Sequence, residues 1–390
     1  MKPSYKNRKL DGLFSYYPIE PGRFSDAYEA KLIASLKKLG AYSESTRLMD
    51  RLPGILDLDA VLGIEVEAEQ VADSLILHPV HGWTVINDSS LRNGGREFIT
   101  APVTPLMAKH LIAALWASFK QHQPDFSWRT SIHVHLNMRN ERVSQVINNL
   151  LLYTLFEDSL FTFIGNSRRQ SNFCVPVQET HMAYYVSELL SGEETLPHVI
   201  NAWSKYTALN IRPLTQNDHA GGMGDATSSG GKGTFEFRHL EGTMDAAKVI
   251  NWINLLLCIQ RYSRQISLED LEERITGITT REHYMGLLRE VFQDFSGLLQ
   301  VRGFSNILYS AVACAKEMFC PIPNIPKLVK MSKDKQTGLS EMIKIRTRFK
   351  KEEENSIPVK KFKAVLSPGE LQEGFDVPIT DWSFPPSSQP

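Results

Sequence analysis

Cysteine is scarce in this sequence. Only Cys174, Cys258, Cys314 and Cys320 occur among 390 residues, and no two of them form a C-x-x-C pair. This scarcity suits a reducing cytosol better than a disulfide-stabilised scaffold, and the sequence offers no C-x-x-C motif. We therefore expect plain buried or free thiols in a reducing compartment.

Long apolar runs and a strong net charge are also missing. No apolar run reaches the roughly 18 residues of a membrane span, and the N-terminal MKPSYKNRKLDG is polar, without the apolar core of a signal peptide. The formal net charge of -1 gives no general attraction to nucleic acid or to an anionic membrane. We expect a cytoplasmic protein without a membrane or nucleic-acid partner, whose function depends on local sites.

Familiar motifs for phosphate binding and nucleophilic catalysis are absent as well. The glycine-rich residues 221–233 match neither the P-loop nor the dinucleotide fingerprint. A flexible connection is the favoured interpretation, and the alternative is a loop that closes over phosphates with Lys232 near its end. No pattern predicts a nucleophilic serine or cysteine.

Composition divides the chain into four predicted segments. We expect an N-terminal extension over residues 1–54, a catalytic domain over 55–265, a helical extension over 266–326 and a basic, partly irregular tail over 327–390. Residues 327–363 hold 12 Lys or Arg against 5 Asp or Glu. Because aromatic side chains are not interleaved with these charges, a solvated or packed surface tail is favoured over a nucleic-acid contact.

The most unusual segment is a predicted strand over residues 62–69. Side chains alternate in a strand, so Glu65, Glu67 and Glu69 share one face. Glutamate is depleted in strands and like charges on one face repel. A bound cation is the simplest compensation.

A hairpin is predicted next. Short extended runs at 83–86 and 96–100 flank the turn residues Asn93 and Gly94, a pair typical of hairpins. Asp88 and Glu97 then lie near opposite ends of the connecting region.

Two later strands carry similar polar faces. Residues 130–138 place His133, His135 and Asn137 on one face, and residues 234–243 place Glu236, Arg238 and Leu240 on one face. Residues 205–212, which include Asn210, are also expected to be extended.

Each polar face alone is compatible with a sheet surface that faces water. Together, however, the strands carry Glu and His in place of the usual Lys, Thr and Ser. Carboxylates with few sulfurs suit Mg²⁺ or Mn²⁺ better than zinc, although His-x-His does not exclude zinc. Such a site with Arg238 beside it is suited to phosphoryl transfer from ATP.

The ordered set of these motifs resembles the amidoligase family, relatives of glutamine synthetase and glutamate-cysteine ligase. The resemblance covers about residues 60–260 and rests on GIEVE (63–67), GGREFITAP (94–102), SIHVHLN (131–137), KYTALN (205–210) and GTFEFRHLEGT (233–243). It implies an α+β fold in which an antiparallel sheet curves around the active site, with helices on its outer face. It also implies an ATP-dependent carboxylate-amine ligase.

The resemblance assigns roles to the strand residues. Glu65 and Glu67 match paired glutamates that bind different divalent ions, and His133 and Glu236 match further metal ligands. His135 matches a position nearer the nucleotide.

Other matches concern catalysis and substrates. Arg238 matches an arginine that stabilises the transferred phosphoryl group, and Glu97 matches an acidic ligand or substrate contact. Asp88 and Asn210 fall at substrate-side positions, whereas Glu69, near the strand end, is expected to be exposed.

The implied reaction activates a carboxylate as an acyl phosphate, which an amine then attacks. The substrates can be small molecules, peptides or proteins, and a homo-oligomer is possible. The alternatives are a phosphotransferase or ATPase of the same superfamily and a noncatalytic binding or assembly protein on the same scaffold.

Overall fold

The structure is a computed structural model that describes most of the first 299 residues. The described residues are 3–16, 19–56, 58–180, 182–192, 194–215, 231–299, 312, 314–316 and 318–319. Most of the glycine-rich segment, most of the expected helical extension beyond residue 299, the basic tail and Cys320 lie outside them. Cys174, Cys258 and Cys314 are buried thiols, as expected. None of the described helices is both long enough and apolar enough to cross a membrane.

Backbone contacts divide the chain into two compact units. The sheet unit comprises Phe14–Asn140 and Leu209–Leu257, and the helical unit comprises Met1–Leu13, Glu141–Ala208 and the residues from Cys258 onward. The four-segment division expected from the sequence stays a prediction.

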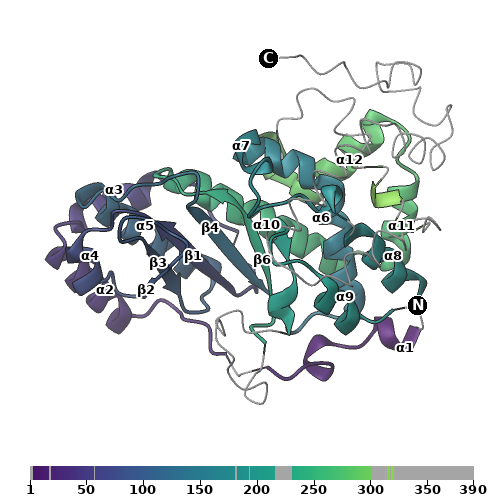
Figure 1. Ribbon diagram of the computed structural model, residues 1–390, viewed down its shortest axis with the longest axis horizontal. Helices are drawn as coiled ribbons and strands as arrows, with labels where there is room; N and C mark the ends of the chain where they lie inside the picture. The colour runs from purple at the N-terminus through teal and green to yellow at the C-terminus, as the bar shows by residue number, and fades with distance from the viewer. Residues whose placement is uncertain are drawn as a thin grey trace. The chain divides into compact units, whose positions relative to one another are not determined.

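A six-stranded antiparallel sheet forms the sheet unit, which confirms the expected α+β class. Its strands follow the order β2-β3-β1-β4-β6-β5 and do not close into a barrel (Figure 1). They are β1 (Leu62–Ala68), β2 (Trp83–Asn87), β3 (Arg96–Thr100), β4 (Ser131–Asn137), β5 (Leu209–Asn210) and β6 (Thr234–Glu241). The predicted hairpin joins β2 to β3, and Asn93 and Gly94 take φ values of 50° and 69° in its turn.

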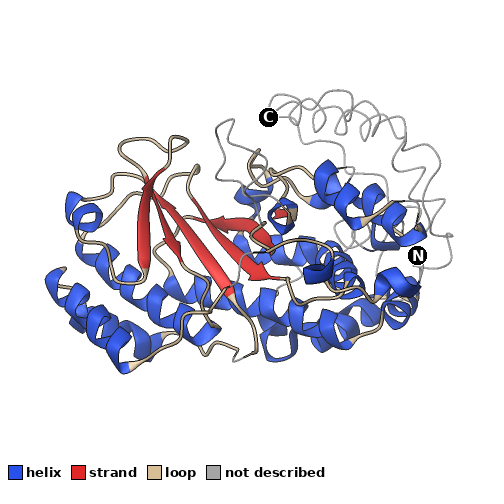
Figure 2. Cartoon of the chain, turned by 90° about the horizontal axis from the view of Figure 1, so that it is seen from below, coloured by secondary structure: helices blue, strands red, loops and turns tan. Residues whose placement is uncertain are grey.

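One face of this sheet is apolar and covered by helices (Figure 2). Its side chains include Ile64, Val66 and Val134, all fully buried. Phe119 of α5 (Pro105–Gln121) packs edge-on against Phe98 of β3, with ring centroids 5.2 Å apart. Burial of this face supplies the hydrophobic stabilisation that holds the strands in register.

Helices of the sheet unit begin at recognisable sequence signals. Thr104 caps α5 by accepting a hydrogen bond from the Met107 amide, and Pro105 fills the first helical position. Ser25 caps α2 in the same way. The helices are α2 (Asp26–Lys38), α3 (Tyr42–Arg51), α4 (Asp73–Leu77), α5 (Pro105–Gln121) and the first part of α10 (Ala246–Gln265).

A β-bulge in β6 changes the predicted face of Leu240. Phe237 pairs with Val134 and Leu240 pairs with Ile132, so two residues, Arg238 and His239, lie opposite one residue of β4. The expectation that Leu240 shares the face of Glu236 was therefore wrong. The extra residue turns Leu240 to the apolar face, where it is fully buried.

The extended segment expected at 205–212 is also shorter than predicted. Only Leu209 and Asn210 pair with β6. A 3-10 helix over Arg212–Leu214 follows at once, and Pro213, which lacks an amide hydrogen, lies within it.

The helical unit is built around α6, which is buried on nearly all sides. Its other helices are α1 (Pro3–Lys6), α7 (Asn166–Arg169), α8 (Met182–Ser191), α9 (Leu196–Ala202), α11 (Leu268–Thr276) and α12 (Arg281–Phe292), with α6 spanning Val143–Ile164. Glu157 lies inside α6 and accepts hydrogen bonds from the Tyr153 hydroxyl at 2.6 Å and from the Val177 and Gln178 amides at 2.7 and 3.0 Å. Burial nevertheless raises the pKa of Glu157 to about 7.

This raised pKa predicts a pH-dependent stability. Between pH 4.5 and about 7 the unfolded chain loses a proton from Glu157 that the folded protein keeps, so the free energy of unfolding falls as pH rises. The loss should reach about 3 kcal/mol across this range. We expect Glu157→Gln to remove this part of the pH dependence in urea unfolding, whereas the exposed Glu272→Gln retains it. An unchanged slope in Glu157→Gln would contradict the assignment.

Candidate active site

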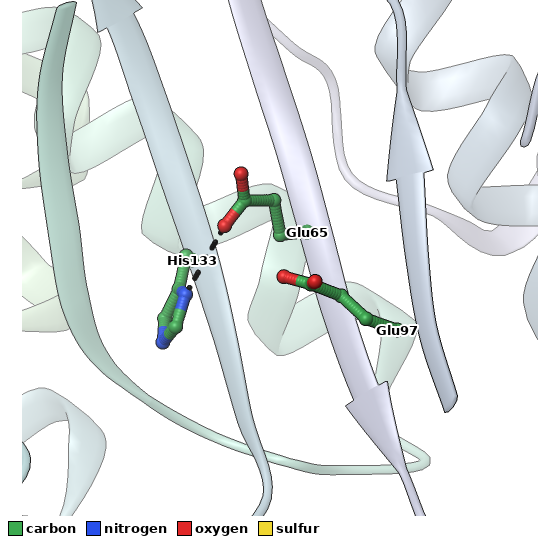
Figure 3. Close-up of side chains that lie close together, drawn as sticks. All are labelled: Glu65, Glu97 and His133. Atoms are coloured by element: carbon green, nitrogen blue, oxygen red, sulfur yellow. Dashed lines mark hydrogen bonds and ion pairs between the residues drawn. The ribbon is translucent and has the colours of Figure 1, made fainter. Parts of the chain in front are cut away.

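The second face of the sheet gathers the predicted site residues. Register places Glu65 beside His133, Glu67 beside Glu97, and His135 beside Glu236. Figure 3 shows Glu65, Glu97 and His133 reaching toward one another from three adjacent strands. Because cross-strand partners point to the same face, the strand order and the register together bring these side chains close to one another.

Glu65 lies at the centre of the cluster. Its Oε2 is 3.3 Å from Nδ1 of His133, and its Oε1 is 3.1 Å from both Nε2 of His135 and Nζ of Lys232. Burial favours the neutral carboxyl, but the cationic and hydrogen-bonding partners His135, His133 and Lys232 hold the pKa of Glu65 well below its usual range. Glu65 is thus a buried carboxylate that depends on positive charge.

Glu236 is held from two sides. Asn210 of β5 donates a hydrogen bond to its Oε2 at 2.7 Å, and Arg238 forms an ion pair with its Oε1. Burial opposes ionisation, yet the charge of Arg238, followed by those of His133 and His135, lowers the pKa of Glu236 to about 2. Asn210 therefore orients a carboxylate in this structure, while its predicted contact with substrate stays a prediction.

The environment of Glu97 favours the neutral carboxyl, in contrast to the environments of Glu65 and Glu236. Burial raises the pKa of Glu97 to about 9, and the nearby carboxylates of Glu65, Glu67 and Asp88 contribute to the shift. Burial and the neighbouring carboxylates therefore both favour the neutral carboxyl of Glu97.

Two overlapping groups of donors could hold metal ions. Within the described part of the chain, Glu65, Glu97 and His133 form one group, and Glu65, His135 and Glu236 form the other. One donor atom from each member lies within 4.8 Å of the others in the same group. Carboxylate oxygens with imidazole nitrogens suit Mg²⁺ or Mn²⁺. The excess of buried acidic groups fits a cation at this place.

Glu67 belongs to neither group. Its Oε2 accepts hydrogen bonds from the amide and the hydroxyl of Ser131 at 2.8 and 2.6 Å. The same hydroxyl lies 2.8 Å from Nε2 of His133. Sequence reasoning missed Ser131, although it stands two residues before His133 and so shares its face. The role of Glu67 as a metal ligand stays a prediction.

Lys232 reaches the cluster from the end of the glycine-rich segment. Arg139, a second residue that sequence reasoning missed, donates two hydrogen bonds to the Lys232 carbonyl at 3.0 and 2.6 Å. The Arg139 guanidinium also lies over the ring of Tyr16, 5.2 Å from its centroid. These contacts fix the backbone beside the Lys232 ammonium, which balances part of the negative charge of Glu65.

Two other predicted residues lie away from the centre. Asp88 accepts a hydrogen bond from the Ser90 amide at 2.7 Å and influences the site through the pKa of Glu97. The expectation that Glu69 is exposed was wrong, because only 5% of it is accessible. Its Oε1 accepts a hydrogen bond from the Arg92 amide at 3.0 Å, so it fixes the turn that follows β2.

Comparison with known families agrees with this geometry. Residues 55–260 match the model of the family described as "Putative amidoligase enzyme". The chain belongs to this amidoligase family. The match spans β1 to β6 and so includes every side chain of the cluster. It confirms the resemblance expected from the motifs and indicates a ligase-type enzyme. A search of curated proteins gave no match.

The crowded carboxylates of this amidoligase predict a response to metal. A divalent ion that binds the folded protein but not the unfolded chain should raise the melting temperature. We expect Mn²⁺ to stabilise the wild-type protein in thermal unfolding and to have much less effect on Glu65→Gln, which weakens both donor groups. Glu44→Gln is the control, because Glu44 pairs with Lys120 outside the cluster. Equal stabilisation of all three proteins would place the ion elsewhere.

Proposed function

We propose that this amidoligase is an ATP-dependent carboxylate-amine ligase that uses Mg²⁺ or Mn²⁺. The observation that carries the proposal is the convergence of Glu65, Glu97 and Glu236 with two imidazoles and Arg238 on one sheet face. Such a constellation is suited to the transfer of a highly charged phosphoryl group. The wider proposal is that the sheet serves as a scaffold of the glutamine synthetase type.

The proposed metal residues are Glu65, Glu97, His133, His135 and Glu236. A divalent ion bound there would offset the negative charge of nucleotide phosphates and of the transferred group. The three carboxylates supply the negative charge that attracts the ion, and the strand register fixes their spacing before it arrives. His135 stands at the position that we assign to the nucleotide side.

Arg238 is the proposed group for the transferred phosphoryl oxygens. Its ion pair with Glu236 orients the guanidinium toward the cluster. Burial opposes its charge, but the surrounding carboxylates, led by Glu236 and then Glu67, raise the pKa of Arg238. It therefore remains a fixed cation whose planar donors match phosphate oxygens. Lys232 is the second proposed contact for the phosphates.

The proposed chemistry has two steps. An oxygen of the substrate carboxylate attacks the γ-phosphorus of ATP, which gives an acyl phosphate and ADP. The amine then attacks the acyl carbon, phosphate leaves with that oxygen, and the nitrogen loses a proton to form the amide. The protein supplies position and charge, and the sequence shows no motif for a covalent nucleophile.

An oxygen-isotope experiment tests this reaction before the substrates are known. The enzyme is incubated with ATP, Mg²⁺ and a deproteinised metabolite extract in ¹⁸O-labelled water, and the products are analysed by mass spectrometry. We expect a new amide together with ADP and phosphate free of water-derived oxygen, because the carboxylate supplies that atom. Phosphate labelled from water, without an amide, would indicate an ATPase. A phosphorylated product would indicate a phosphotransferase.

Substitution of Arg238 provides a second prediction. Arg238→Ala should lower the rate of ADP formation by roughly tenfold or more, because a fixed cation at the transferred group is lost. Arg47→Ala is the matched control, since Arg47 is an exposed arginine of the same unit outside the site. Equal rates in Arg238→Ala and the wild-type enzyme would remove Arg238 from the proposed mechanism.

A further inference from the structure

The Ser131 hydroxyl contacts both Glu67 and His133, two predicted site residues that do not belong to the same group of possible metal donors. Ser131 is the first residue of β4 and is 4% exposed. Its hydroxyl oxygen lies 2.6 Å from Oε2 of Glu67 and 2.8 Å from Nε2 of His133, whereas Nε2 lies 3.9 Å from the nearer Glu67 oxygen, Oε1. The hydroxyl therefore connects the carboxylate to the imidazole by hydrogen bonds, since 3.9 Å is too long for a direct hydrogen bond between the two.

The protons available on Ser131 decide which atom is the donor and which is the acceptor in its hydrogen bonds with Glu67 and His133. A serine hydroxyl has one proton to donate and lone pairs to accept with. Oε2 of Glu67 already accepts the Ser131 amide proton at 2.8 Å, so it is an acceptor and also receives the hydroxyl proton. The hydroxyl can then only accept from His133. Nε2 of His133 must carry a proton, and in a neutral imidazole Nδ1 then carries none.

The second ring nitrogen of His133, Nδ1, faces two carboxylates, so its protonation decides how it interacts with them. Nδ1 of His133 lies 3.3 Å from Oε2 of Glu65 and 3.4 Å from Oε1 of Glu236. In the imidazolium form Nδ1 also carries a proton, which it donates to Glu65. When the imidazole is neutral and Nε2 keeps the proton, Nδ1 and the two carboxylate oxygens present lone pairs to one region. That arrangement is repulsive alone and favourable around a cation.

We propose that Ser131 and Glu67 are positioning residues that hold His133 as the Nε2–H tautomer and thereby leave Nδ1 available to bind a divalent ion together with Glu65. The inference rests on the proposed metal-dependent function, and it replaces a direct metal bond from Glu67 with an action through Ser131. Histidine ligands commonly donate their second N–H to an outer partner, and loss of such partners typically weakens metal binding about 10- to 100-fold.

Nitrogen NMR of the metal-free protein tests the tautomer directly. The full chain is labelled with ¹⁵N-histidine, His133 is assigned by comparison with His133→Gln, and spectra are recorded at a pH at which imidazole is neutral. We expect Nε2 to be protonated in the wild-type protein. In Ser131→Ala the proton should move to Nδ1, where Glu65 and Glu236 can accept it. Protonated Nδ1 in the wild type, or an unchanged tautomer in Ser131→Ala, would overturn the inference.

Matched variants separate this role from a general loss of packing. Ser131→Thr keeps a hydroxyl at this position and should therefore keep the wild-type tautomer of His133. Ser118→Ala removes another fully buried serine hydroxyl, which donates to the Ala114 carbonyl at 3.0 Å within α5, and should leave the His133 signal unchanged. A tautomer change in Ser118→Ala would attribute the effect to packing and overturn the inference.

Mn²⁺ affinity, measured by electron paramagnetic resonance titration, then tests the proposed metal site separately from the proposed role of Ser131. We expect Ser131→Ala to bind Mn²⁺ about 10- to 100-fold more weakly than wild type. Glu67→Gln should weaken binding less than Glu65→Gln, because an amide oxygen can still accept from Ser131. No Mn²⁺ binding by the wild type would refute the proposed metal site. Normal wild-type binding with equal affinity in Ser131→Ala would refute the role of Ser131 alone.

Discussion

Repulsion among carboxylates on one face of a sheet is the constraint on which the rest of the site depends. Glu65 shares one group of possible metal donors with Glu97 and a second group with Glu236, and the three carboxylates come from three strands. The protein balances part of that charge with Arg238 and Lys232. Burial, followed by the nearby carboxylates, raises the pKa of Glu97 and favours its neutral form. A divalent cation would stabilise the ionised carboxylates, and the proposed chemistry uses the same ion.

The fold makes this concentration of charge tolerable. Burial of the apolar face beneath helices such as α5 fixes the strand register, and a one-residue slip would exchange the two faces. Register is thus stabilised by hydrophobic contacts remote from the charges. The bulge in β6 adds a local adjustment, since it places Arg238 opposite His133 while Leu240 returns to the core.

Much of this arrangement could be predicted from alternation in the sequence. The period of two placed Glu65, His133 and Glu236 on one face, and the motif order indicated the family. Features set by contacts between distant segments could not be read in that way. The bulge at Arg238 and the burial of Glu69 depend on backbone hydrogen bonds that no local pattern specifies.

The missed residues illustrate two different limits. Side-chain alternation places Ser131 on the same face as His133, but a serine carries no charge. Only its distances to Glu67 and His133 reveal a role. Arg139 acts through the backbone of Lys232, 93 residues later in the chain. Side chains that position other groups are harder to predict than the groups they position.

We expect the carboxylate and histidine cluster to hold a divalent ion in contact with nucleotide phosphate. Electron spin echo spectroscopy of the protein loaded with Mn²⁺ and a nonhydrolysable ATP analogue tests both contacts at once. The same Mn²⁺ population should show magnetic coupling to histidine nitrogen and to phosphorus, with the nitrogen signal reduced in His133→Gln. Coupling to phosphorus without histidine nitrogen, or to neither nucleus, would contradict this expectation.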